Sequence, residues 1–170
     1  MVRKKKKKLP IDIPLEELLA GAGSKQRLLG LDLGTKTIGL AVSDTGKRIA
    51  SPLETIQRSK FGKDAERLQE ICEKQEIGGF VLGLPLNMDG SEGPRAQATR
   101  DFYISLREFW RERGLPFIPV TFWDERLSTV AVTRTLLEAD TSRARRGEVV
   151  DKMAASFILQ GALDRGKNLT

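Results

Sequence analysis

Three acidic residues stand where a lone charge is unfavourable, and they are the first candidates for chemistry. Asp32 ends an apolar run that begins at Leu28, Glu125 follows the run 117–123, and Asp151 stands early in the last helical pattern. Burying a carboxylate costs several kcal/mol, roughly, unless hydrogen bonds or a metal ion compensate the charge. Carboxylates grouped around divalent cations could hydrolyse phosphodiester bonds, because the ions activate water and stabilise the leaving oxygen.

Each acid also has an ordinary structural interpretation. Asp32 could cap its turn, Glu125 could pair with Arg126, and Asp151 could complement the dipole of its helix. Together they favour a shared metal site, because three carboxylates in one place repel each other and a cation relieves that repulsion. The chain has no histidine, which excludes Ser-His-Asp and Cys-His catalysis and histidine ligands for zinc. Oxygen ligands suit one or two Mg²⁺ or Mn²⁺ ions.

The periodicity of apolar residues predicts a mixed sheet that would bring these acids together. Three strands joined by short turns come first, and strands then alternate with helices, which predicts an α/β fold with helices packed on the sheet. Expected strands cover 28–33, the run from 38, 49–56, 79–84 and 117–123, and expected helices cover 61–72, 94–113, 128–138 and 148–163, with a loop at 139–147.

This arrangement predicts where the acids meet. Ligands of α/β sheets gather outside the carboxyl ends of the strands, which is where Asp32 and Glu125 stand. Asp151 shares a helical stripe with Ala155 and Ile158, so its side chain is expected to face the sheet.

Charge divides the chain into a basic extension and a balanced body. The net charge is +6, but residues 1–27 contain eight basic and three acidic residues, which leaves the body near +1. We expect 1–27 to be a basic flexible extension with a short helix at 11–20, 28–165 to be one folded domain, and 166–170 to be a tail. No run approaches the roughly 18 apolar residues of a membrane span, and the single cysteine fits a reducing cytosol.

Basic and polar residues near the predicted site are candidates for binding phosphates. Lys36 and Thr37 lie in the first turn, and Arg126 could clamp a phosphate through two parallel hydrogen bonds. Each candidate fits an ordinary surface position equally well. The remaining candidates are Asn87 and Arg95 after the fourth strand, and Arg143, Arg145 and Arg146 before Asp151.

The chain resembles the YqgF (RuvX-like) family in four stretches that occur in the family's order. They are LDLGTKTIGLAVSD at 31–44, GLPLNMDGSEGPRA at 83–96, DERLST at 124–129 and DKMAASFIL at 151–159. Members are named as pre-16S rRNA nucleases and, earlier, as Holliday junction resolvase-like proteins. The resemblance covers about 28–164. It implies an RNase H-like fold with a mixed five-stranded sheet, and catalytic, metal-binding roles for Asp32, Glu125 and Asp151. It also implies a cytoplasmic role in maturing the 5′ end of 16S rRNA.

Three other functions stay open at this stage. A Holliday junction resolvase would use the same metal chemistry and act as a homodimer on a symmetric DNA junction. However, the fourth strand ends in Gly83-Leu84-Pro85 without the acid that such resolvases carry there. A non-catalytic RNA-binding assembly factor would use the fold only to bind. A nucleotide-binding module would use the Asp-x-Gly-Thr turn for phosphates, but it needs a second such domain to enclose ATP.

Overall fold

A computed structural model describes residues 11–127 and 143–169, with 143–150 described by their backbone only. In this part of the chain no helix is long and apolar enough to span a lipid bilayer. The helices are α1 (Leu15–Gly21), α2 (Phe61–Lys74), α3 (Pro94–Glu112) and α5 (Arg143–Lys167), and a 3-10 turn, η1, covers Glu125–Leu127. The strands are β1 (Arg27–Leu33), β2 (Thr37–Ser43), β3 (Ala50–Gln57), β4 (Ile77–Leu84) and β5 (Val120–Asp124).

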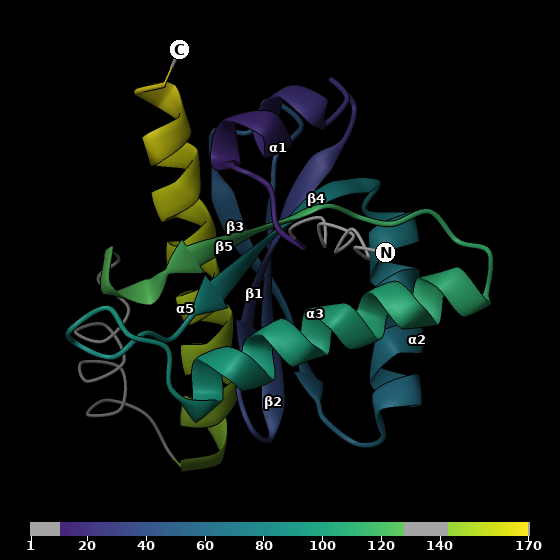
Figure 1. Ribbon diagram of the computed structural model, residues 1–170, viewed down its shortest axis with the longest axis vertical. Coiled ribbons are helices and arrows are strands. Elements are labelled where there is room, and N and C mark those ends of the chain that lie inside the picture. Colours follow the sequence, from purple (N-terminus) through teal and green to yellow (C-terminus); the bar gives the residue numbers. More distant parts are fainter. Residues whose placement is uncertain (1–10, 128–142, 170) are drawn as a thin grey trace, which may run out of the picture.

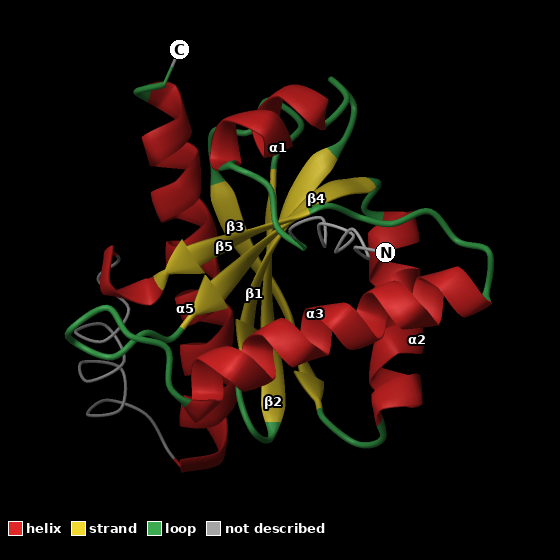
Figure 2. Ribbon diagram, in the orientation of Figure 1, coloured by secondary structure: helices red, strands yellow, loops and turns green. Residues whose placement is uncertain are grey.

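The five strands form one mixed sheet in the order β3-β2-β1-β4-β5 (Figure 2). β1, β2 and β3 are antiparallel neighbours, whereas β4 and β5 run parallel to β1. The predicted mixed sheet of five strands is therefore confirmed. Because β1, β4 and β5 run in the same direction, their carboxyl ends lie at one edge of the sheet, as the positions of Asp32 and Glu125 require.

Helices cover both faces of the sheet. In Figure 1, α3 crosses in front of the strands and α5 lies behind them. Side chains of α2 and α3 pack with Leu29, Leu31 and Phe80 in one core, and side chains of α5 and α1 pack with Leu28 and Val81 in the other. Successive residues of a strand point to opposite faces, so β1 and β4 contribute to both cores and are apolar along nearly their whole length.

Part of the predicted flexible extension packs on the sheet. The short helix expected at 11–20 is present as α1, and its residues Leu15 and Leu18 are buried against the α5 side. Just before it, the backbone N–H of Ile13 donates to the carbonyl of Val120 over 2.9 Å, which covers the edge strand β5. The prediction of flexibility was wrong for 11–27, because the apolar residues of α1 find a second core; 1–10 lie outside the described residues.

Several predicted boundaries differ from those in the structure, and two of the larger differences are at the starts of β5 and α5. β5 begins at Val120 rather than at 117, and the last helix begins at Arg143 rather than at 148. The polar, arginine-bearing stretch before 148 was interpreted as a loop because it lacks apolar residues, yet polar residues can also form helix ends. The helix predicted at 128–138 lies outside the described residues.

Candidate active site at the carboxyl edge of the sheet

Asp32 lies near the end of β1, the central strand of the sheet, and its neighbour on each adjacent strand is a glycine. On β2 its partner is Gly39, and on β4 the register that pairs Leu31 with Leu82 places Gly83 beside it. Asp32 is only 5% exposed. Its face is that of Gly30, two residues earlier, where an added Cβ would lie 2.9 Å from a carbonyl oxygen of α5. The Asp32 side chain therefore faces α5.

The two flanking glycines leave the space that the other two acids occupy. A Cβ added to Gly39 would lie 2.1 Å from the carbonyl oxygen of Asp151, so the helix backbone rests directly on β2 there. A Cβ added to Gly83 would lie 2.8 Å from Oε1 of Glu125. Because neighbouring strands are about 4.8 Å apart, Asp151 of α5, which lies over β2, and Glu125 of η1, which lies over β4, flank Asp32 on its two sides. The structure thus places the three predicted acids at neighbouring positions.

In this conformation the side chains do not converge on a single point. Among residues 11–127 and 151–169, no group of three or more acidic, cysteine or histidine side chains is arranged to hold a metal ion. The hydroxyl of Thr37, at the start of β2, donates a hydrogen bond to the carboxylate of Asp151 and fixes the direction in which it points. Thr37 was expected to contact a phosphate, but in the structure it orients one of the acids.

Arg126 pairs with Asp124 in the structure. Its guanidinium binds the Asp124 carboxylate through hydrogen bonds of 2.7 to 3.1 Å, and its Nη1 donates to the carbonyl of Met88 over 3.1 Å. This pairing holds the pKa of Asp124 below its usual value and raises that of Arg126. Arg126 thus joins the end of β5 to the loop after β4 and pairs with Asp124 rather than with Glu125. A contact between Arg126 and a phosphate stays a prediction.

The loop after β4 is held by its own hydrogen bonds. The side chain of Asn87 donates to Ser91 Oγ over 2.9 Å, and the backbone N–H of Asn87 donates to the Ser91 carbonyl over the same distance. The Asp89 carboxylate accepts from the backbone and hydroxyl of Ser91, which lowers the pKa of Asp89. Asn87 therefore shapes the loop, while its exposed position leaves a direct contact with substrate as a prediction.

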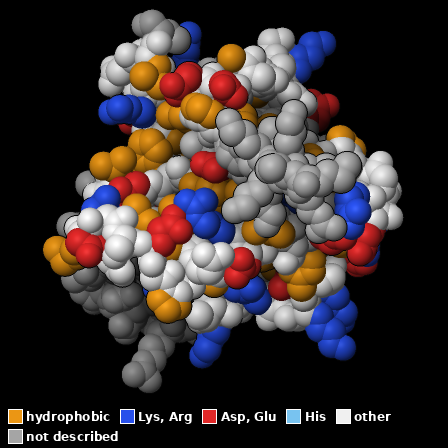
Figure 3. Space-filling model, viewed as in Figure 1, with side chains coloured by type: hydrophobic (Ala, Val, Ile, Leu, Met, Phe, Trp, Pro, Cys, Tyr) orange, Lys and Arg blue, Asp and Glu red, His pale blue; other side chains and the backbone are white. Residues whose placement is uncertain are grey.

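Of the other basic candidates, Lys36 and Arg95 have described side chains, and the three arginines before Asp151 do not. Lys36 is exposed in the β1–β2 turn, and Arg95 is exposed in the first turn of α3. Arg143, Arg145 and Arg146 belong to the first turns of α5, and their side chains lie outside the described residues. On the face seen in Figure 3, the described acidic and basic side chains are interspersed, in line with the small net charge of the body.

A family model named RuvX, described as "Holliday junction resolvase", matches residues 26–165. The chain belongs to the RuvX family. It is 60% identical over 153 residues to a "Putative pre-16S rRNA nuclease" of Methylocella silvestris, covering 90% of this chain and 91% of the relative. It is also 60% identical over 156 residues to a protein of the same name from Paramagnetospirillum magneticum, covering 92% and 96% of the two chains.

A solved structure supports the fold of this RuvX family member. The chain is similar to the structure titled "T. thermophilus RuvC in complex with Holliday junction substrate", with a TM-score of 0.52 at 15% identity. The match covers 83% of this chain and 96% of that chain. At this identity the likeness shows the fold alone, which confirms the RNase H-like, resolvase-type architecture that the four sequence motifs implied.

Sequence reasoning missed the residues that position the acids. Gly39 and Gly83 stand inside strands, and a glycine inside a strand often marks a close approach of another backbone. That signal was present at Gly83, where the absence of an acid was noticed but the space it leaves was not. Arg58, which contacts the β1–β2 turn, carried no motif and could not have been singled out from its type alone.

Proposed function

We propose that this protein is a divalent-metal-dependent nuclease that processes the 5′ end of 16S rRNA precursors. The observation that carries the proposal is the flanking of Asp32 by Asp151 and Glu125 in the space left by Gly39 and Gly83. The names of relatives that are 60% identical over nearly the whole chain support the substrate. Ribosomal RNA is made and trimmed in the bacterial cytoplasm, which is the compartment that the proposal implies.

The three acids fit a hard divalent cation such as Mg²⁺ or Mn²⁺. They offer only carboxylate oxygens, which these ions prefer, and the chain has no histidine to bind zinc. When bound, the ion would activate water and stabilise charge on the leaving oxygen. Asp32 would be its fixed ligand because β1 holds it in a buried position, and Asp151, oriented by Thr37, and Glu125, by side-chain rotation, would complete the set.

Other residues of the chain hold these acids in position. Thr37 donates to one Asp151 carboxylate oxygen, which limits the rotation of that side chain. The close packing of α5 on β2 fixes the backbone of Asp151, and η1 fixes that of Glu125 directly after β5. Among the candidates for binding phosphates, Lys36 is exposed in the β1–β2 turn. Arg95 is also exposed, and it lines the same hollow as Gly34 and Thr35 of that turn.

The test is a cleavage assay with two competing substrates. Purified protein would be incubated with Mg²⁺ or Mn²⁺, a precursor RNA that includes the 5′ end of 16S rRNA, and a four-way DNA junction. We expect cleavage of the RNA in preference to the junction, and none by Asp32→Asn. Preference for the junction would favour the resolvase function for which the family model is named, and RNA binding without metal-dependent cleavage would favour a non-catalytic assembly factor.

A further inference from the structure

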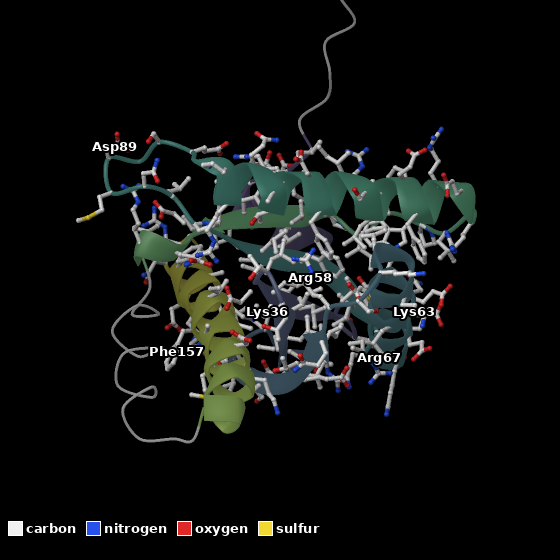
Figure 4. All side chains as sticks on the ribbon, turned by 90° about the horizontal axis from the view of Figure 1, so that it is seen from below. Lys36, Arg58, Lys63, Arg67, Asp89 and Phe157 are labelled. Carbon is white, nitrogen blue, oxygen red and sulfur yellow. The ribbon has the colours of Figure 1, made fainter. Side chains whose placement is uncertain are left out.

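Three basic side chains from three different elements surround the β1–β2 turn. Lys36 belongs to the turn, Arg58 follows β3, and Arg95 is in the first turn of α3. Arg58 and Arg95 line a small hollow of about 60 Å³ together with Gly34 and Thr35 of the turn. In Figure 4, Arg58 lies beneath α3 and Lys36 lies toward α5, so the basic side chains lead from one face of the sheet to the other.

These three cations have no acidic partner among the described residues. Some other arginines of the body do, since Arg67 pairs with Glu54 and Glu70, and Arg100 pairs with Glu92. Cations held together without carboxylates raise the local positive potential and favour the binding of an anion. The turn is thus a basic site within a body whose charges are otherwise nearly balanced.

Arg58 is held in place before any anion binds. Its Nη1 donates to the carbonyl of Gly34 over 2.5 Å, and its backbone N–H donates to the carbonyl of Lys36 over 2.8 Å. The guanidinium carbon lies 5.7 Å from the centre of the Phe102 ring. No described residue accepts from the other guanidinium N–H groups. An arginine ordered in this way loses little conformational entropy when it binds a phosphate through paired hydrogen bonds.

The position of the turn indicates which anion it would bind. Gly34 is two residues from Asp32, and the backbone N–H of Gly34 donates to the carbonyl of Thr37, whose hydroxyl holds Asp151. A polymer whose scissile phosphate lies at the acids on the α5 face reaches this turn when it continues across the edge of the sheet. Its next phosphates would then meet Lys36 and Arg58 on the way to the α3 face.

We propose that Arg58, together with Lys36 and Arg95, binds a backbone phosphate that flanks the cleaved one in the nucleic-acid substrate. This inference rests on the proposed nuclease function. The inferred site is a second contact region for the substrate, on the α3 side of the sheet edge. The nucleic acid would then run from the acids to the start of α3. Arg58 is a substrate-binding residue in this account and takes no part in the bond-breaking step.

The test measures RNA binding in an Asp32→Asn background, where cleavage is expected to stop. A labelled RNA that includes the 5′ end of 16S rRNA would be titrated at several salt concentrations with Arg58→Ala, Arg58→Lys, Arg95→Ala and the control Arg67→Ala. We expect Arg58→Ala to raise Kd about tenfold at low salt and to reduce the slope of log K against log salt by about one. Arg58→Lys should recover part of the affinity, and Arg67→Ala should match the parent.

Thermal unfolding of each variant separates binding from folding. Arg58→Ala that stays folded and binds like Arg67→Ala overturns the inference while leaving the nuclease proposal intact, provided that the parent binds. A parent that binds no RNA overturns both. If Arg58→Ala does not fold, the exposed Arg95 decides, since an unchanged Kd and an unchanged salt slope for Arg95→Ala would contradict the proposed phosphate site.

Discussion

The two faces of the sheet are packed in different ways, and the difference explains where the acids meet. On the α2 and α3 side, large rings fill the space, with Phe80 and Tyr103 each about 6 Å from Trp110 between ring centres. On the α5 side, Gly30 and Gly39 let the helix backbone touch the strands. Large side chains keep a helix away from the sheet, whereas glycines admit its backbone, so only the α5 face can place a short helical carboxylate beside Asp32.

The largest expected effect comes from the buried acid on the α5 face. Asp32→Asn should reduce metal-dependent cleavage by about two orders of magnitude or more, because loss of an anionic ligand removes several kcal/mol of charge stabilisation by the metal. RNA binding should be largely kept. The matched control is Asp64→Asn on the opposite side, because Asp64 is equally buried but only accepts hydrogen bonds from Ser59. Equal loss of cleavage in both variants would refute the distinction between the faces.

The next effect concerns the close contact itself. Gly39→Ala places a methyl group 2.1 Å from the Asp151 carbonyl, so the helix must move. We expect a loss of about 3 kcal/mol in the free energy of unfolding and a large loss of cleavage per folded molecule. Phe80→Leu on the other face should lower stability by about 1–2 kcal/mol and leave cleavage per folded molecule nearly unchanged. Urea unfolding would measure the stability of the two variants, and cleavage rates divided by the folded fraction would measure their activity. A normal cleavage rate per folded molecule for Gly39→Ala would contradict the account.

A smaller effect is expected where the Asp151 carboxylate is oriented. Thr37→Val removes the hydroxyl that donates to it while keeping the shape of the side chain. Groups that orient a metal ligand typically contribute 10–100-fold to metal affinity or activity, so we expect a loss of about tenfold. Thr37→Ser keeps a hydroxyl and serves as the control. Activity titrated against Mn²⁺ should show a weaker apparent affinity for Thr37→Val, and identical curves for the two variants would argue against this role.

The smallest effect concerns Arg126, which joins the end of β5 to the loop after β4. Because Arg126 holds the pKa of Asp124 below its usual value, the pair stabilises the fold above the ordinary carboxyl pKa of about 3.9, and this is lost as the pH falls through the lowered pKa. Arg126→Ala should therefore lower stability only slightly at neutral pH, since the pair is partly exposed and screened by solvent.

That small difference should disappear in acid. Urea unfolding of the wild type and of Arg126→Ala would be compared at neutral pH and well below the Asp124 pKa, with the same comparison repeated in an Asp124→Asn background. A stability difference that grows in acid, or that persists unchanged when Asp124 is replaced, would show that the effect of Arg126 does not come from its pairing with Asp124.

Much of the fold could be predicted because it follows from local patterns. The apolar runs of β1 and β4 and Pro94 at the start of α3 each point to one element. The acids of the site could be predicted, because a charge such as Asp32 at the end of an apolar strand is unfavourable unless a partner or a metal ion compensates it.

Cys72 is buried, which raises its pKa to about 12 and removes it as a nucleophile near neutral pH.

The rest could not be predicted because it depends on contacts between distant parts of the chain. Whether Arg126 meets Asp124, Glu125 or a phosphate is decided by the geometry of η1 and of the loop at Met88. The bond between Thr37 and Asp151 joins residues 114 positions apart. The position of α5 over Gly39 depends on which strand pairs with β1, and no local pattern encodes that pairing.

The central claim is that Asp32, Glu125 and Asp151 form one binding site for a divalent cation, and metal binding tests it most directly. Calorimetric titration of Mn²⁺ would be compared for the wild type, Asp32→Asn, Glu125→Gln, Asp151→Asn and the control Asp64→Asn, with folding checked by thermal unfolding. We predict that each of the three site variants weakens Mn²⁺ binding at least tenfold while the control matches the wild type. Folded site variants that bind Mn²⁺ as tightly as the wild type would contradict the claim.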